Sequence, residues 1–208
     1  MEEMKEVVIK SLKKAEKIIF IFHKYGSSKE KFSVIGRSLS KKFDNAEIHI
    51  PDGPQACDEG DGRQWFPFIS EDSSDWKNSY YEVAPILETY INNTLKQNNL
   101  KYEDVILTGF SQGAMVSLML GLKLGVKAIV AFSGQLLDAN INMQHNRIPK
   151  ILLVHGKKDT IVPISEMYSA QNVLKKKNIP TEIFVSETAM HSIDIDMFKA
   201  GINFLKNL

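Results

Sequence analysis

Short apolar runs alternate with segments of helical period along almost the whole chain, and this alternation constrains the fold more than any other feature. Residues 18–22 form a continuous apolar run that ends before Gly26, as expected of a strand buried on both faces. Apolar residues at positions 32, 35, 39 and 43 follow at the spacing of one helix face. Strands and helices that alternate in this way form an open, mostly parallel sheet with helices on both faces. The sequence therefore predicts a doubly wound α/β fold.

The same alternation predicts the remaining elements. Further strands are expected at residues 46–50, 105–108, 126–132, 151–155 and 181–185. Helices are expected at residues 115–124, from Pro163 to about Lys177, and after Ser192, which is typical of an N-cap. A longer helix with apolar residues at 86, 87, 90, 91 and 95 should begin close to Pro85, because proline is tolerated in a first turn. Residues 1–16 fit either a helix or, at 7–9, an edge strand.

Composition limits the classes of protein that need to be considered. The 208 residues fit one domain, residues 1–208, with an apolar share of 43% and a charged share of 25% that are ordinary for a soluble protein. A net charge of +1 gives no overall attraction to nucleic acid. We find no apolar stretch typical of a signal peptide or a membrane span. Cys57 is the one cysteine, so no intramolecular disulfide can form. We therefore expect a cytoplasmic protein, and a homodimer is compatible with this sequence.

The segment Gly-Phe-Ser-Gln-Gly, residues 109–113, lies between an expected strand and an expected helix. A serine in this G-x-S-x-G pattern sits on a strained strand-to-helix turn that exposes its hydroxyl above the sheet. Gly109 and Gly113 flank the turn at positions where side chains would collide with the neighbouring strand and helix. The alternative is a glycine-bounded loop that matches the pattern by chance. The strand–turn–helix context favours Ser111 as a nucleophile on an α/β-hydrolase fold.

A serine hydroxyl needs a base that takes its proton, and five histidines are available. On this fold the chain order is serine, then an acid, then histidine, which excludes His23 and His49. His145 lies in a polar loop and is more typical of a solvated surface residue. His155 ends a strand and has only one plausible acid upstream of it. His191 follows the last expected strand and precedes the last helix, which is the position that the base requires.

Two aspartates compete to orient His191. Asp159 stands four residues after His155 at a strand-ending turn, and Asp138 follows the strand after the serine turn. Asp138 is also typical of a turn or helix-capping residue. We favour Asp159, whose carboxylate would fix the imidazole tautomer and stabilise the imidazolium.

An oxyanion hole would complete such a site, because charge that develops on the substrate oxygen needs fixed hydrogen-bond donors. The backbone N–H of Gln112, directly after the serine, is one expected donor. The second should come from the loop after an early strand, and residues 23–26 form the available loop. We expect no metal and no cofactor, since the chemistry needs neither and no Cys/His cluster has the spacing of metal ligands.

Taken together, these segments resemble the phospholipase/carboxylesterase family of small α/β hydrolases, which includes acyl-protein thioesterases and lysophospholipases. The likeness covers about residues 18–206. It is carried by Phe-His-Lys-Tyr-Gly at 22–26, Pro-Asp-Gly-Pro at 51–54, Gly-Arg-Gln-Trp-Phe at 62–66, Gly-Phe-Ser-Gln-Gly at 109–113, His-Gly-Lys-Lys-Asp-Thr-Ile-Val-Pro at 155–163 and His-Ser at 191–192.

The resemblance implies a role for further residues. It implies a catalytic triad of Ser111, Asp159 and His191, with the backbones of Tyr25 and Gln112 as oxyanion donors. It also implies that Trp65 and Phe66 line the acyl site, with Ile161 and Val162 on the opposite side. Trp65 and Phe66 are also compatible with aromatic residues that merely cover the core.

One position departs from the family pattern, because Lys24 stands where the family usually has a glycine. If the backbone there requires a positive φ, lysine costs about 1 kcal/mol and the oxyanion loop shifts. Otherwise the Lys24 side chain points harmlessly to solvent.

The predicted function is the hydrolysis of carboxylic esters or thioesters through an acyl-enzyme intermediate. The segment 134–150 is too short for a lid domain, so we expect an open site, and the aromatic residues between 65 and 76 favour an apolar acyl group. Two alternatives are a serine peptidase with the same triad and a non-catalytic binding module on the same fold. The peptidase would need acidic residues that hold a free N-terminus, and the binding module would lack a triad member.

Overall fold

A computed structural model describes residues 4–57, 60–68, 73–143 and 145–208. In these residues seven strands form one sheet in the order β1-β3-β2-β6-β7-β8-β9. The strands are β1 Glu6–Ile9, β2 Lys17–Phe22, β3 Ala46–Pro51, β6 Val105–Phe110, β7 Ala128–Phe132, β8 Lys150–Gly156 and β9 Thr181–Ser186. Two short strands, β4 Gln55–Ala56 and β5 Arg63–Gln64, pair separately. The predicted α/β architecture is confirmed.

Every neighbouring pair in the large sheet is parallel except β1 with β3, which is antiparallel. The segment 7–9, for which the sequence fitted either a helix or a strand, is therefore the edge strand β1. The central strands β2, β6, β7 and β8 are buried over almost all their residues, because helices cover both faces of the sheet.

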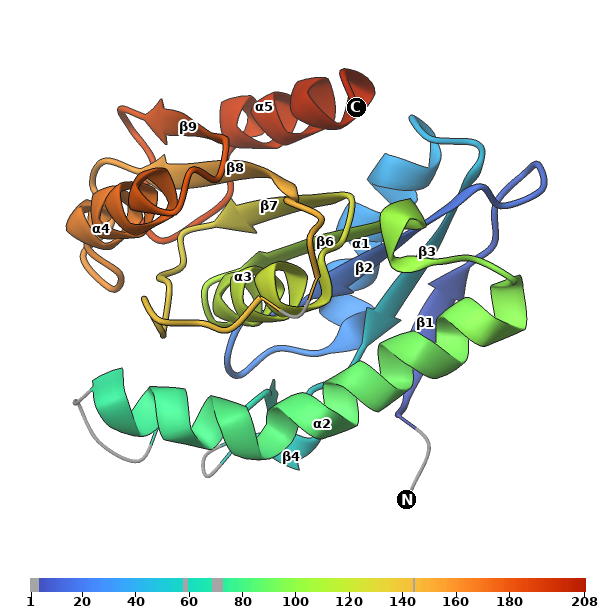
Figure 1. Cartoon of the computed structure of the whole chain (residues 1–208), viewed down its shortest axis with the longest axis horizontal. Helices are drawn as coiled ribbons and strands as arrows, with labels where there is room; N and C mark the ends of the chain where they lie inside the picture. Colours follow the sequence, from blue (N-terminus) through green and yellow to red (C-terminus); the bar gives the residue numbers. More distant parts are fainter. Residues whose placement is uncertain (1–3, 58–59, 69–72, 144) are drawn as a thin grey trace.

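Helices lie on both faces of the sheet, as Figure 1 shows. The helices are α1 Lys29–Ser40, α2 Ser73–Asn98, α3 Gln112–Leu124, α4 Ile164–Lys176 and α5 Ile195–Lys206, with a 3₁₀ turn, η1, at Tyr102–Asp104. α2, α3 and α4 cover one face, and α1 and α5 cover the other (Figure 1). Two hydrophobic clusters match these layers, one beneath α2, α3 and α4 and one beneath α1 and α5.

The start of α2 differs from the sequence expectation. The helix begins at Ser73, so Pro85 lies inside it and not near its first turn. An internal proline removes one backbone hydrogen bond and costs about 3 kcal/mol or more. The apolar residues Val83, Leu87 and Ile91 are buried against the rest of the core, and this tertiary packing keeps the helix continuous through the proline.

The start of α5 also differs. Asp194, and not Ser192, is the N-cap, because its Oδ1 accepts a hydrogen bond from the Met197 N–H at 2.8 Å. Ser192 lies in the preceding turn, where its own N–H donates to the Met190 carbonyl. The observed cap lies two positions after the predicted one, and both Ser192 and Asp194 carry side chains suited to capping.

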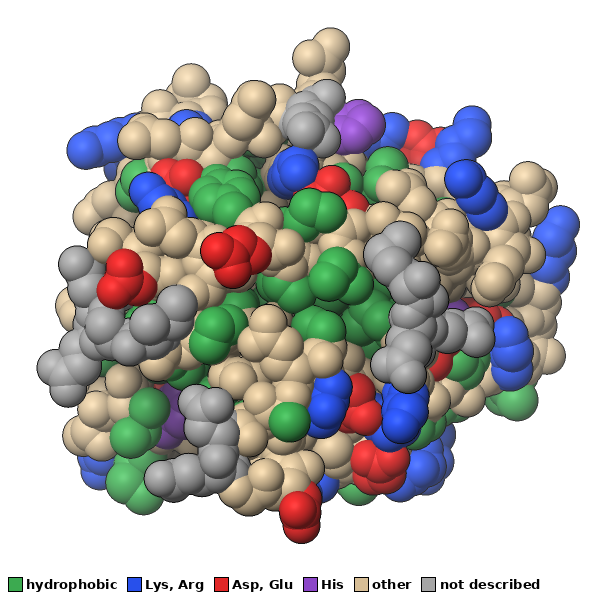
Figure 2. Space-filling view, turned by 90° about the horizontal axis from the view of Figure 1, so that it is seen from below, with side chains coloured by type: hydrophobic (Ala, Val, Ile, Leu, Met, Phe, Trp, Pro, Cys, Tyr) green, Lys and Arg blue, Asp and Glu red, His purple; other side chains and the backbone are tan. Residues whose placement is uncertain are grey.

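The segment between β7 and β8 contains no helix or strand in its described residues, and no lid domain is evident there. Within the described ranges, none of the helices combines the length and the apolar character that a membrane span needs. The same ranges hold no group of three or more His, Cys, Asp or Glu residues arranged for a metal ion. On the α2 side, basic and acidic side chains are interspersed around exposed apolar ones (Figure 2).

Candidate active site

Ser111 occupies a sharp turn between β6 and α3. Its backbone has φ 57° and ψ −118°, a conformation that a non-glycine residue adopts only when the surrounding structure enforces it. A Cβ on Gly109 would lie 2.3 Å from the Gly113 carbonyl oxygen, and a Cβ on Gly113 would lie 2.1 Å from the Phe22 carbonyl oxygen. Both contacts are with backbone, which cannot give way. The two glycines therefore let helix, strand and turn approach closely enough to expose the serine.

Three side chains form a hydrogen-bond chain at this turn. His191 Nε2 lies 3.0 Å from Ser111 Oγ, and His191 Nδ1 lies 2.8 Å from Asp159 Oδ2. Since a carboxylate can only accept, Nδ1 carries a proton and donates it to Asp159, which leaves Nε2 able to accept the serine proton. Ser111 follows β6, Asp159 follows β8 and His191 follows β9, so three strand ends supply the chain.

Asp159 is held as a buried carboxylate. Burial alone would raise its pKa, but the hydrogen bond with His191 and those from the backbone N–H groups of Val162 and Ile161 outweigh burial, so the pKa lies below its usual value. Asp138, the competing candidate, lies elsewhere: it accepts from the Tyr81 hydroxyl at 2.8 Å and from the Asn140 N–H. The structure thus brings Asp159, and not Asp138, to His191.

His155 supports the turn that carries Asp159. Its Nε2–H donates to the Val162 carbonyl at 2.9 Å, and its ring lies 3.6 Å from the Asp159 carboxylate. Burial lowers the pKa of His155 and favours the neutral ring. His155 therefore packs against the acid and the turn that carries it.

The loop after β2 is fixed by His23. The neutral ring donates from Nδ1 to the Lys24 carbonyl and accepts at Nε2 from the Gly53 N–H. Burial lowers the pKa of His23, which keeps Nε2 free to accept. The Gly26 N–H donates to the Arg63 carbonyl at 3.0 Å. The loop that carries Tyr25 is therefore anchored on both sides.

Lys24 adopts an ordinary backbone conformation. The described non-glycine residues with positive φ are Asn99, Ser111, Ser133 and Asn178, and Lys24 is not one of them. In this loop the left-handed conformation falls on Gly26, with φ 71°. A lysine at position 24 therefore imposes no left-handed strain, and its side chain is exposed.

Trp65 and Phe66 do not lie where the resemblance implied. Both are fully buried, and neither contributes to the cleft described below. The Trp65 indole N–H donates to the His23 carbonyl, and the Gln112 side chain bridges the Trp65 N–H and the Phe66 carbonyl. The buried polar groups of these two aromatic residues bind them to the serine turn and to the loop after β2, which draws their rings into the core.

A cleft of about 380 Å³ opens beside Ser111 and His191. Ile161 and Val162 line it, as the resemblance implied. Its other lining residues are Lys24, Tyr25, Phe68, Trp76, Met115, Gln135, Pro163 and Glu166. Phe68 makes ring contacts with Tyr25 and Trp76, with centroids 5.5 and 4.7 Å apart, and these rings form one continuous apolar wall.

Several of these cleft residues have no role in the sequence-based site. Met115 had a local signal, since it lies one helical turn after Ser111 and so shares its face of α3. Glu166 lies in the first turn of α4 and Gln135 in the segment after β7, where sequence spacing gives no indication of their position. For Lys24 the sequence pattern indicates only a departure from the family glycine, and gives no sign that its side chain lines the cleft.

Comparison with known proteins shows the family to which the chain belongs. A family model described as phospholipase/carboxylesterase matches residues 3–208. Esterase YpfH of Escherichia coli K12 is 25% identical over 201 residues, covering 93% of this chain and 84% of that protein. The solved structure of esterase PE8 is 26% identical, with a TM-score of 0.93 and coverage of 99% of both chains. The Bacillus cereus carboxylesterase is 15% identical with a TM-score of 0.80 over 98% of this chain and 94% of that one, a likeness of fold.

The family match spans nearly the whole chain, and the strand order, the strained serine turn and the solved esterase structure agree with it. The chain belongs to the phospholipase/carboxylesterase family and is a carboxylic ester hydrolase with the α/β-hydrolase fold.

Proposed function

We propose that this chain hydrolyses esters or thioesters of apolar acyl groups through an acyl-enzyme formed on Ser111. The observation that carries the proposal is the continuous hydrogen-bond chain from Asp159 through His191 to Ser111, with 2.8 and 3.0 Å between the heavy atoms. In this reading Ser111 is the nucleophile, His191 the general base and acid, and Asp159 the group that orients the imidazole.

The proposed reaction has two halves. Ser111 Oγ attacks the acyl carbon while His191 Nε2 takes its proton, and the carbonyl oxygen becomes an oxyanion. The backbone N–H groups of Tyr25 and Gln112 stabilise that charge. The alcohol or thiol then leaves with the proton from His191. Water then attacks the acyl carbon of the acyl-enzyme while His191 takes one of its protons. His191 returns that proton to Ser111 Oγ as the bond to the serine breaks, which releases the carboxylic acid and free Ser111.

The lining of the cleft supports an apolar acyl group. Phe68 and Trp76 form an apolar wall, Ile161 and Val162 also line the cleft, and Met115 lies near Ser111, to whose carbonyl its N–H donates. Burying a methylene of the substrate against such walls stabilises the complex by about 0.8 kcal/mol. Lengthening the acyl chain should therefore raise kcat/KM until the cleft is filled.

Covalent labelling tests the nucleophile. A fluorophosphonate should label the wild-type protein at Ser111, and Ser111→Ala should lose both labelling and ester hydrolysis. Ser117→Ala, which changes another buried serine of α3, is the matched control and should keep the labelling. Failure of the wild type to label would favour a non-catalytic binding module.

A substrate panel tests the reaction class. p-Nitrophenyl esters of increasing chain length would be assayed beside an acyl thioester, a lysophospholipid and a peptide amide. Turnover of the esters or the thioester well above the amide supports the proposal. Preference for the amide would instead identify a serine peptidase, the alternative that shares the same triad.

Two finer expectations stay predictions. We propose that the protein works in the cytoplasm, because its one cysteine requires no oxidising compartment. A homodimer is compatible with the sequence, and light scattering coupled to size exclusion would measure the assembly.

A further inference from the structure

Lys24 places a positive charge in the cleft. It lines the same cleft as Ser111 and His191, and it is exposed. Its backbone carbonyl is fixed by His23 and by the Ser27 N–H, so the side chain starts from an anchored loop. Among the ion pairs of the described residues none involves Lys24, so no carboxylate in that part of the chain neutralises it.

The charges of the cleft are separated. Lys24 follows β2 and Glu166 lies at the start of α4, after β8, and these two strands lie on opposite sides of β6. Ser111 follows β6 and therefore lies between them. Glu166 also takes part in no ion pair of the described chain. A substrate bound at Ser111 thus has a cation on its β2 side and a carboxylate on its β8 side.

We infer that Lys24 makes this enzyme select esters that carry an anionic group, a carboxylate or phosphate, a few atoms from the scissile carbonyl. The inference rests on the proposed function, because it assumes acyl transfer at Ser111. An ammonium ion attracts such an anion over the distance that a lysine side chain spans, and the partly enclosed cleft screens the attraction less than open water does. Glu166 repels the same anion and so directs it toward Lys24. Phe68 and Trp76 still accept the apolar part of the substrate.

Pairs of matched substrates test the inference. On the acyl side, mono(4-nitrophenyl) glutarate is compared with the corresponding glutaramate, which replaces the carboxylate by a carboxamide. On the alcohol side, 4-carboxyphenyl butyrate is compared with 4-carbamoylphenyl butyrate. The readout is the ratio of kcat/KM within a pair, which a uniform loss of activity leaves unchanged. We expect the wild type to favour the anionic member of at least one pair by about fivefold, the worth of a good exposed ion pair.

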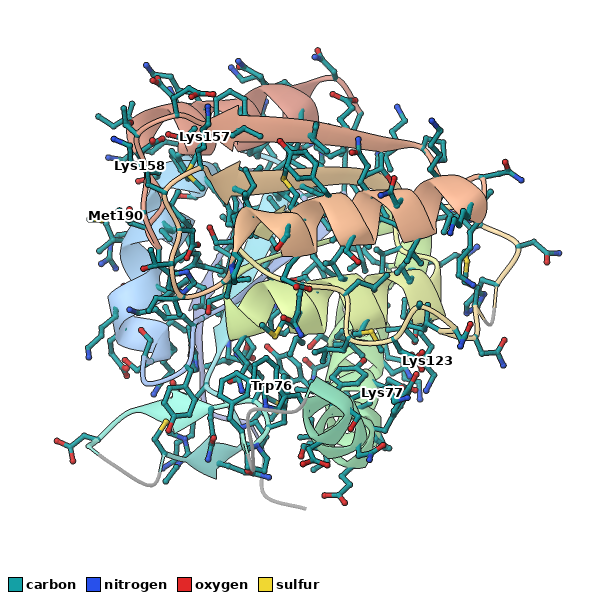
Figure 3. All side chains as sticks on the ribbon, turned by 90° about the vertical axis from the view of Figure 1, so that its left-hand side faces the viewer. Trp76, Lys77, Lys123, Lys157, Lys158 and Met190 are labelled. Atoms are coloured by element: carbon teal, nitrogen blue, oxygen red, sulfur yellow. The ribbon has the colours of Figure 1, made fainter. Side chains whose placement is uncertain are left out.

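Substitutions assign the preference to Lys24. Lys24→Gln should bring the kcat/KM ratio of anionic to neutral ester close to one. Lys24→Arg should keep most of the wild-type ratio, and Glu166→Gln should increase it. Raising the ionic strength should lower kcat/KM for the anionic ester only, because salt screens exposed charges. Lys158→Gln is the matched control: Lys158 lies near Lys157 and Met190 and away from Trp76 (Figure 3), and it does not line the cleft. Its variant should keep the ratio.

The possible outcomes distinguish the proposed role of Lys24 from the proposed ester hydrolysis at Ser111. If both pairs are hydrolysed through Ser111 with ratios near one, or if Lys24→Gln keeps the wild-type ratio, the selection by Lys24 is wrong while the hydrolase proposal stands. If no ester of either kind is hydrolysed in a Ser111-dependent way, the proposed function itself fails.

Discussion

Single residues set the geometry of the serine turn. Gly113 is the tightest of them, because a Cβ there would lie 2.1 Å from the Phe22 carbonyl oxygen and 2.6 Å from that of His23. Phe22 ends β2, and His23 begins the loop that carries the proposed oxyanion donor Tyr25. Adding one methyl group would therefore push α3 away from the end of β2 and the loop after it. This would change the distance between the nucleophile Ser111 and the proposed oxyanion donor Tyr25.

Gly113→Ala should destabilise the fold and remove activity. Overpacking typically lowers the free energy of unfolding by about 1–3 kcal/mol, and a clash with rigid backbone should reach the upper end of that range, which urea denaturation measures. Gly201→Ala in α5 is the control: its nearest neighbour would be the end of the Phe132 ring at 3.0 Å, and alanine is the better helix former. The control should change stability by no more than about 1 kcal/mol. Equal losses in the two variants would contradict the steric argument.

Asp159→Asn should lower kcat/KM by about 10⁴, because an amide can turn its N–H₂ toward His191 and so favour the wrong imidazole tautomer. Asp138→Asn is the matched control, since Asp138 bonds to Tyr81 instead. We expect it to stay within about twofold of the wild type, as surface changes usually do. Steady-state hydrolysis of a p-nitrophenyl ester measures both. A large loss in Asp138→Asn with normal activity in Asp159→Asn would reverse the assignment.

At the level of elements, α5 depends on its first turn. Asp194 accepts from the Met197 N–H and from the Ser186 hydroxyl, and these hydrogen bonds lower its pKa below the usual value. The helix packs on β8 and β9, the two strands that lead to Asp159 and His191. The cap of α5 therefore also helps to secure the loop that carries His191.

Asp194→Ala should cost about 1 kcal/mol of unfolding free energy at neutral pH. The folded-state pKa lies below the unfolded value of 3.8, so the charge stabilises the fold above that pH and stops doing so as the pH falls through the folded pKa. The difference from wild type should thus shrink below about pH 4. Ser192→Ala, at the cap that the sequence favoured, should have no such effect. Urea denaturation over a pH series measures both variants.

The sequence predicted the strands and the order of Ser111, Asp159 and His191 because these follow from local period and chain order. It could not predict that α2 runs through Pro85, since that depends on packing against the core. It also left open whether Trp65 and Phe66 line the acyl site or cover the core. Their positions depend on hydrogen bonds to Gln112 and His23, which are distant in the chain. Long-range partners of this kind leave no local pattern.

At the scale of the whole molecule, two hydrophobic clusters share one sheet. One lies under α2, α3 and α4 and the other under α1 and α5, and the same buried strands face both. Loss of either cluster would expose one face of every central strand. This mutual dependence is the physical basis for a single domain over residues 1–208, which stays a prediction.

Unfolding should therefore be one cooperative transition. Trp65 lies in the α2-side cluster and Trp76 packs against it, so tryptophan fluorescence reports that side, while far-UV circular dichroism reports all elements. The two urea midpoints should coincide. A second circular dichroism transition after the fluorescence change is complete would show that the α1–α5 side is stable by itself, and would contradict the single-domain prediction.

The bridge made by Gln112 has a consequence for how this enzyme can diversify. The Gln112 side chain hydrogen-bonds residues 65 and 66 to the serine turn. In this segment, Phe66 is therefore the last residue that is held directly to the turn carrying Ser111. Phe68 and Trp76 lie beyond this residue and face the cleft. Changes at these two positions can retune which acyl groups fit without disturbing the nucleophile. Substitutions at Phe68 and Trp76 can thus change the acyl specificity, in evolution or by engineering, while the geometry of the Ser111 turn stays the same.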